Sequence, residues 1–194
     1  TDYAQTYGAL RSRVSDLVRE ADDEQLERRA PAASEWRVRD LVAHLSGITA
    51  DVNAGNLDGV ATDAWTARQV DARRDWSIEQ LLEEWSTEAA KVEALMASLP
   101  EAAVGQMTTD AATHEQDIRG ALGEPGGRDS TAAEVAFAWF VDAATPVGLA
   151  DGEGVRLPAG CGADDAAESG GDASHEDLWG RVAQAFLMMS VGDR

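Results

Sequence analysis

Two histidines and three aspartates have the residue types and spacing that could hold a metal ion. His44 lies in the stretch WRVRDLVAHLSG, and Asp51 follows it seven residues later. His114 lies in TTDAATHEQDIRGALG, with Asp110 four residues before it and Asp117 three residues after it. At about 100° per residue, each histidine falls beside the apolar stripe of its helix, with its aspartates on the same side.

This arrangement predicts a metal centre built from two helices. A carboxylate and an imidazole at positions i and i+4 can chelate one divalent ion, as Asp110 and His114 would do. His44 on a facing helix would then be a third ligand, which leaves open the coordination position that a catalytic metal needs. Asp51 or Asp117 could accept the free N–H of a ligating imidazole and so orient it.

The same residues also have a purely structural interpretation. A histidine beside an apolar stripe is often a hydrogen-bonded residue at the edge of the core, and an Asp–His pair four residues apart is common on helix surfaces. Asp51 and Asp117 would then be solvated carboxylates. Periodicity alone leaves both interpretations open.

Other residues offer little chemistry. Cys161 is the only cysteine, so an intrachain disulfide is excluded and a reducing cytoplasm is expected. Its Gly-rich surroundings do not predict an activated thiolate. His175 follows Ser174 at an expected helix start and is interpreted as structural or exposed. The six tryptophans are expected to pack inside a helical bundle.

The elements that must position these residues follow from the helical recurrence of apolar side chains. Ser77 and Gln80 form a capping box at one helix start, and Gly123 followed by Pro125 marks a helix end. We expect a mainly α protein, an antiparallel four-helix bundle. The predicted helices span residues 2–21, 37–54, 77–98, 108–123 and 131–144.

The character of the sequence changes after Pro146. Residues 1–146 are expected to form the bundle, and residues 147–194 a short extension with a possible strand and a helix over 175–189. The acidic, Gly-rich run ADDAAESGGDAS is typical of a flexible linker.

The composition excludes some partners. The formal net charge of −20 argues against binding nucleic acid or an anionic membrane, because such binding needs clustered Lys and Arg. No apolar run is long enough to span a bilayer, and the first residues lack the pattern of a secretion signal. A cytoplasmic protein is expected, and either a monomer or a homodimer is compatible with the sequence.

Three separated segments resemble a known family. WRVRDLVAHLSG, AWTARQVDARRDWSIEQLLEEW and TTDAATHEQDIRGALGEP are similar, in the same order, to segments of actinobacterial members of the mycothiol-dependent maleylpyruvate isomerase N-terminal family. That family belongs to the wider group of DinB-like metal-binding bundles. The resemblance covers roughly residues 5–145 and is specific because all three segments agree in spacing.

The resemblance implies a metal site and a thiol cosubstrate. His44, Asp110 and His114 match the family's metal-binding positions, with Asp110 where the family usually has Glu, and the implied ion is divalent, most commonly zinc. Mycothiol or a similar thiol is the implied cosubstrate. The segment WGRVAQAFLMMSVGDR partly matches the end of the family's second domain, and this match makes Arg181 a candidate residue for binding the thiol.

Three functions remain open at the level of the sequence. The first is a metal-dependent, thiol-dependent transferase or isomerase that acts on a small electrophile, in which the ion favours the thiolate over the thiol. The second is a metal-binding bundle that acts as a sensor or binding module without turnover. The third is a bundle that has lost its metal and serves as a structural or interaction protein.

Overall fold

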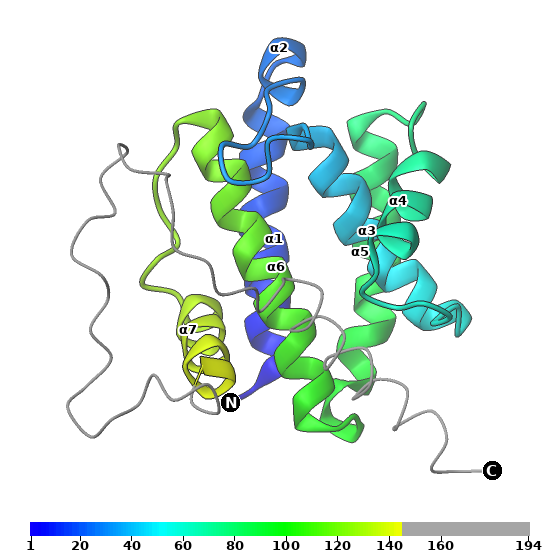
Figure 1. Cartoon of the computed structure of the whole chain (residues 1–194), viewed down its shortest axis with the longest axis vertical. Helices are drawn as coiled ribbons and strands as arrows, with labels where there is room; N and C mark the ends of the chain where they lie inside the picture. Colours follow the sequence, from blue (N-terminus) through cyan, green and yellow to red (C-terminus); the bar gives the residue numbers. More distant parts are fainter. Residues whose placement is uncertain (145–194) are drawn as a thin grey trace, which may run out of the picture.

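The computed structural model describes residues 1–144, and this part of the chain is mainly helical and contains no strand. Its elements are α1 Tyr3–Glu20, α2 Asp23–Leu26, α3 Val38–Ala54, α4 Asp63–Ala72, α5 Ile78–Leu95, the 3₁₀ turn η1 Met96–Ser98, α6 Glu101–Leu122 and α7 Thr131–Ala144. Helices α1, α3, α5 and α6 form a bundle, with α4 beside α3 and α7 beside α6 (Figure 1). The mainly helical bundle fold expected from the sequence is confirmed.

The directions of the bundle helices add a detail that the sequence did not predict. Helices α3 and α5 run parallel, because Ser46 contacts Glu84 and, further along both helices, Asn53 donates to the carbonyl of Glu88. They can do so because α4, which follows α3 and precedes α5 in the chain, carries the chain back toward the end of the bundle where α3 begins (Figure 1).

Helices α1 and α6 are parallel as well, since Tyr3 contacts Glu101 and Arg13 contacts Glu115. Helices α3 and α6, which carry the two histidines, are antiparallel, since Trp36 just before α3 contacts His114 and the later His44 lies beside Asp110.

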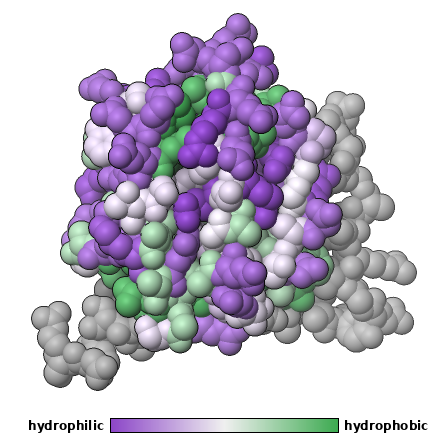
Figure 2. Space-filling model, turned by 180° about the vertical axis from the view of Figure 1, so that it is seen from behind, coloured by the Kyte–Doolittle hydropathy of each residue, from purple (hydrophilic) through white to green (hydrophobic). Residues whose placement is uncertain are grey.

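The core lies between the four bundle helices. The apolar stripes predicted for α1, α3 and α5 are largely buried, among them Leu10, Val14, Leu41, Leu45, Leu81 and Trp85. Leu95, the last residue of α5, is 54% exposed, whereas Met96 in the 3₁₀ turn that follows is buried in the core. Figure 2 shows that hydrophilic side chains dominate the face turned away from the viewer in Figure 1.

One helix boundary and one whole helix differ from the prediction. Helix α6 begins at Glu101, directly after Pro100, and not at residue 108. Its first turns lack a strong apolar stripe, and they are held by contacts with other helices. Gly105 is one such contact, because a Cβ there would lie 3.1 Å from the ring of Trp139 on α7. The second difference is α4, which the sequence analysis left unassigned.

The start of α3 is fixed by an ion pair. Asp40 accepts a hydrogen bond from the backbone N–H of Arg37 at 2.9 Å and two more from its guanidinium at 2.8 and 2.7 Å. Burial alone would raise the pKa of Asp40, but the hydrogen bonds from Arg37 outweigh it and lower the pKa. The helix that carries His44 therefore begins at a defined residue although it lacks a Ser or Thr cap.

No helix within residues 1–144 is both long enough and apolar enough to cross a membrane. The predicted strand and last helix, together with Cys161, His175 and Arg181, lie outside the described residues.

Candidate metal centre

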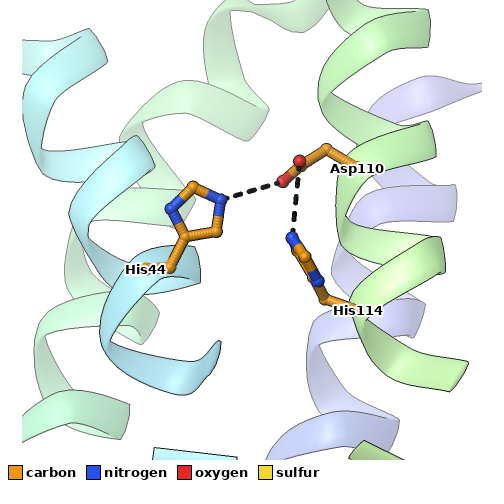
Figure 3. Close-up of side chains that lie close together, drawn as sticks. All are labelled: His44, Asp110 and His114. Atoms are coloured by element: carbon orange, nitrogen blue, oxygen red, sulfur yellow. Dashed lines mark ion pairs between the residues drawn. The ribbon is translucent and has the colours of Figure 1, made fainter. Parts of the chain in front are cut away.

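His44 from α3 and the pair Asp110 and His114 from α6 point toward one another (Figure 3). His44 Nε2 lies 3.6 Å from Asp110 Oδ2, and His114 Nε2 lies 3.6 Å from Asp110 Oδ1. Each residue offers one ligand atom, and these three atoms all lie within 4.8 Å of one another. The three residues singled out from the sequence therefore form one cluster, although they come from two helices and His44 and Asp110 are 66 positions apart in the chain.

The cluster has the dimensions of a metal site. Ligand atoms at about 2.1 Å from a tetrahedral ion lie roughly 3.4 Å apart, close to the 3.6 Å between each histidine Nε2 and one oxygen of Asp110, Oδ2 for His44 and Oδ1 for His114. These distances are too long for hydrogen bonds, and Asp110 Oδ2 is buried without a hydrogen-bond partner among the described residues. Since buried carboxylate oxygens are rarely left without a partner, a cation between the three side chains fits this arrangement.

The proton of His44 is positioned by a chain of two further residues. Asp51 Oδ2 can only accept a hydrogen bond, so the amide atom of Gln69 that faces it is the nitrogen Nε2, which donates to it at 2.8 Å. The amide oxygen of Gln69 therefore faces His44 and accepts from Nδ1 at 2.8 Å. Nδ1 then carries the proton, which leaves the lone pair of Nε2 directed toward Asp110.

His114 is oriented in the same way by a residue on its own helix. Its Nδ1 lies 3.0 Å from Asp117 Oδ2, which accepts a hydrogen bond from Nδ1–H. Nε2 is again the nitrogen that faces Asp110. Asp117 thus contacts its imidazole directly, as the sequence analysis expected for an orienting carboxylate, whereas Asp51 reaches His44 only through Gln69.

Gln69 is the residue of this site that the sequence analysis missed. It lies on α4 and is 2% exposed. Gly47 on α3 makes room for it, because a Cβ on Gly47 would lie 2.6 Å from Cβ of Gln69. Arg73 anchors the end of α4 by donating to Glu84 on α5 at 2.9 Å and to the carbonyl of Gln69 at 3.1 Å. Gly47, in the quoted stretch around His44, was the one signal that side chains of another element pack closely there.

Electrostatics couples the residues of the cluster. Burial alone would raise the pKa of Asp110, but the nearby imidazoles of His114 and His44 outweigh it and lower this pKa. Burial alone would lower the pKa of His114, but the carboxylates of Asp110 and Asp117 outweigh it and raise this pKa. The cluster therefore favours an anionic Asp110 beside a positive charge.

Trp36, directly before α3, covers the two imidazoles. Its ring stacks on His114 with a centroid distance of 5.8 Å and an angle of 22°. It meets His44 edge-on at 5.2 Å. Trp36 was expected to pack in the bundle, and in the structure it packs against the cluster itself.

A cavity of about 460 Å³ opens beside the cluster, and all three residues are part of its wall. Ile48 and Val52 on the flank of α3 also line it, as does Trp65 on α4. A small molecule bound here would contact the cluster. The described arrangement therefore combines three candidate metal ligands, two oriented imidazoles and room for a ligand.

One family model matches most of the described chain. The family model of the mycothiol maleylpyruvate isomerase N-terminal domain matches residues 7–144, which include α3, α6 and every residue of the cluster. No curated protein and no solved structure gives a match. Because the family model covers well over half of the chain, this protein belongs to the mycothiol maleylpyruvate isomerase N-terminal domain family.

Proposed function

We propose that the protein is a divalent-metal-dependent transferase or isomerase that joins a mycothiol-like thiol to a small electrophile. His44, Asp110 and His114 would hold the ion, most commonly zinc in such a site. The single observation that carries the proposal is the cluster itself, with its three ligand atoms within 4.8 Å of one another in the wall of a cavity. The family's name supplies the link to the thiol.

The roles of the neighbouring residues follow from their contacts. Gln69 and Asp117 hold the Nδ1 protons of the two imidazoles, so both Nε2 atoms stay available as ligands. Trp36 packs against both imidazoles, and the wall of the adjoining cavity is mostly apolar. An ion bound there would stabilise a thiolate relative to the thiol near neutral pH.

The reaction has two possible forms. In a transfer, the thiolate sulfur forms a bond to the electrophilic carbon, and the leaving group departs with its bonding electron pair. In an isomerisation, the thiolate sulfur adds to one carbon of a conjugated carbon–carbon double bond, and the π electron pair moves onto the conjugated electron-withdrawing group. The resulting single bond rotates, and return of the pair restores the double bond and expels the thiolate. Arg181 remains a predicted contact of the thiol cosubstrate.

The first test is the metal content of protein purified without a histidine tag. We expect one divalent ion per chain, which is lost in His44→Ala and in His114→Ala because each change removes a ligand. His175→Ala removes the third histidine of the chain and is the matched control, which should keep the ion. Retention of the ion in both cluster variants would contradict the proposal.

The second test is turnover. Mycothiol is mixed with a panel of small electrophiles, and consumption of both is followed by mass spectrometry. We expect consumption that depends on the thiol and disappears in the two cluster variants. A stoichiometric ion without turnover across the panel would instead favour a sensor or binding module.

A further inference from the structure

Three buried side-chain atoms of the described residues have no hydrogen-bond partner: Gln106 Oε1, Thr109 Oγ1 and Asp110 Oδ2. All three belong to α6, and their residues line the cavity beside the cluster. Buried polar atoms are rarely left without a partner, so their gathering in one wall indicates that a ligand supplies the partners. An ion at the cluster would account for Asp110, but it leaves Gln106 and Thr109 without an explanation.

Thr109 differs from the other two threonines of α6. Thr108 donates to the carbonyl of Val104 at 2.7 Å, and Thr113 donates to the carbonyl of Thr109 at 2.9 Å. Bonding to the carbonyl four residues earlier is a common way for a helix to satisfy a threonine hydroxyl. Thr109, which is only 4% exposed, makes no such bond, so its hydroxyl stays available to a ligand in the cavity.

Gln106 decides the kind of ligand group that fits. Its side chain is 6% exposed, and an amide oxygen can only accept a hydrogen bond. No described residue donates to Oε1, so the missing partner must be an N–H or O–H group. Thr109 Oγ1 can donate or accept, so it fits a second polar atom of the same ligand group. A neutral amide offers both, an N–H for Gln106 and a carbonyl for Thr109.

The two groups lie one helical turn from the cluster. Gln106 precedes Asp110 by four residues on α6, which corresponds to a rise of about 6 Å along the helix. Trp139 on α7 packs against this turn, because a Cβ on Gly105 would lie 3.1 Å from its ring, and Trp139 also lines the cavity. The cluster and the two polar groups are therefore parts of one binding space, and one ligand can reach both.

We propose that Gln106 and Thr109 form a subsite that binds a neutral amide group of the thiol or of the electrophile, beside the ion. Gln106 Oε1 accepts from the amide N–H, and the Thr109 hydroxyl donates to the amide carbonyl. A protonated amine would also donate to Gln106, but a divalent ion one turn away would repel it. The inference rests on the proposed function, because it places the subsite beside the ion, and it adds the residues and the ligand group that meet there.

The test compares two neutral ligands of the same shape. N-benzylacetamide and benzyl acetate share a ring and a carbonyl, but the first has an N–H where the second has an ester oxygen. Isothermal titration calorimetry is performed on metal-free and on zinc-loaded full-length protein. We expect the amide to bind at least about tenfold more tightly in both forms. Equal binding of the two would show that water satisfies Gln106 and Thr109, and it would overturn the inference, as would no binding of the amide.

A second pair of ligands shows which molecule carries the amide. N-methylmercaptoacetamide and methyl mercaptoacetate are small thiols that differ in the same N–H, and both are titrated into zinc-loaded protein. A preference for the amide in this pair places the N–H on the thiol. A preference confined to the benzyl pair places it on the electrophile. Either result supports the subsite.

Three variants show whether Gln106 and Thr109 are responsible. Gln106→Met keeps the length of the side chain without its amide, and Thr109→Val keeps its shape without the hydroxyl. Both should remove most of the roughly tenfold preference for the amide. Thr108→Val is the matched control, since Thr108 bonds to the backbone and does not line the cavity, and it should keep the preference. An unchanged preference in Gln106→Met would overturn the inference.

Urea denaturation distinguishes a ligand-binding role of Gln106 from a structural one. Its amide oxygen has no partner among the described residues, so Gln106→Met should unfold at the same or a higher urea concentration than the unmodified protein. A clearly lower midpoint would show that the amide holds the fold together and would overturn the inference.

The zinc content of the same samples separates this inference from the proposed function. Zinc binding without a preference for the amides would refute the subsite alone. A preference for N-benzylacetamide in protein that never binds an ion would support the subsite and refute the metal-dependent function.

Discussion

At the scale of single residues, the two imidazoles of the cluster are held by different kinds of partner. His114 depends on Asp117 three residues away on the same helix, so local helix geometry maintains that contact. His44 depends on Gln69, which belongs to another helix and is itself held by Asp51. The orientation of His44 is therefore sensitive to a residue that is not a candidate ligand.

The change Gln69→Met tests this dependence. Methionine has a similar length but cannot accept the Nδ1 proton, so His44 loses its fixed tautomer and ring orientation. We expect zinc affinity to fall by about 10- to 100-fold, measured by competition with a chromophoric chelator. Gln5→Met, on the exposed side of α1, is the matched control and should leave the affinity unchanged. An affinity equal to that of the unmodified protein would show that Gln69 only fills space.

At the scale of secondary-structure elements, the ion pair of Asp40 and Arg37 makes the start of α3 dependent on pH. The pKa of Asp40 is lower in the folded protein than its ordinary value near 3.9. Its contribution to stability is therefore fully present above the ordinary pKa and is lost as the pH falls through the lowered, folded value.

The change Asp40→Asn should lower the free energy of unfolding by about 1 to 2 kcal/mol at pH 7, and by progressively less as the pH falls below about 4. Urea denaturation at a series of pH values measures this difference. Asp16→Asn is the control, since it removes an ion pair with Arg19 that has the same spacing but is largely exposed, and it should cost less than about 0.5 kcal/mol. A loss for Asp40→Asn that does not change with pH would rule out the charged pair as its cause.

The elements also show how far the sequence can predict this site. Helical periodicity places His44, Asp110 and His114 beside the apolar stripes of their helices, and the resemblance to the family then singles them out as metal ligands. Gln69 could not be found in this way, because α4 buries only Trp65 and Gln69 and so carries no apolar stripe that would reveal it. The early turns of α6 were missed for a related reason: they are stabilised by contacts with distant helices, which a local pattern does not contain.

At the scale of the whole molecule, Glu115 connects three parts of the fold. It is 1% exposed and accepts hydrogen bonds from Arg13 on α1 at 3.0 and 2.7 Å and from Arg119 on α6 at 3.1 Å. The turn before α7 passes close to it, since a Cβ on Gly127 would lie 2.5 Å from Oε1. Helices α1 and α6 and the approach to α7 thus share one buried carboxylate.

The change Glu115→Ala should lower the free energy of unfolding by about 3 kcal/mol, because two guanidinium groups lose their carboxylate and a cavity replaces it. The value is expected at the lower end of the usual range, since Arg13 is 30% exposed and can be solvated. Urea denaturation measures it, with the exposed Glu83→Ala as a control expected to stay within about 0.5 kcal/mol. A similar, small effect of both changes would show that the buried ion pairs contribute no net stability.

The position of Trp36 also allows the cluster of His44, Asp110 and His114 to be followed by tryptophan fluorescence. Its indole touches both imidazoles, so binding of an ion or loss of a proton at either ring changes the surroundings of this chromophore. Five other tryptophans emit as well, and a Trp36→Phe variant would isolate the share that responds to the cluster. The chain therefore carries an intrinsic fluorescent reporter, and occupancy of the cluster can be followed in solution without attaching a label.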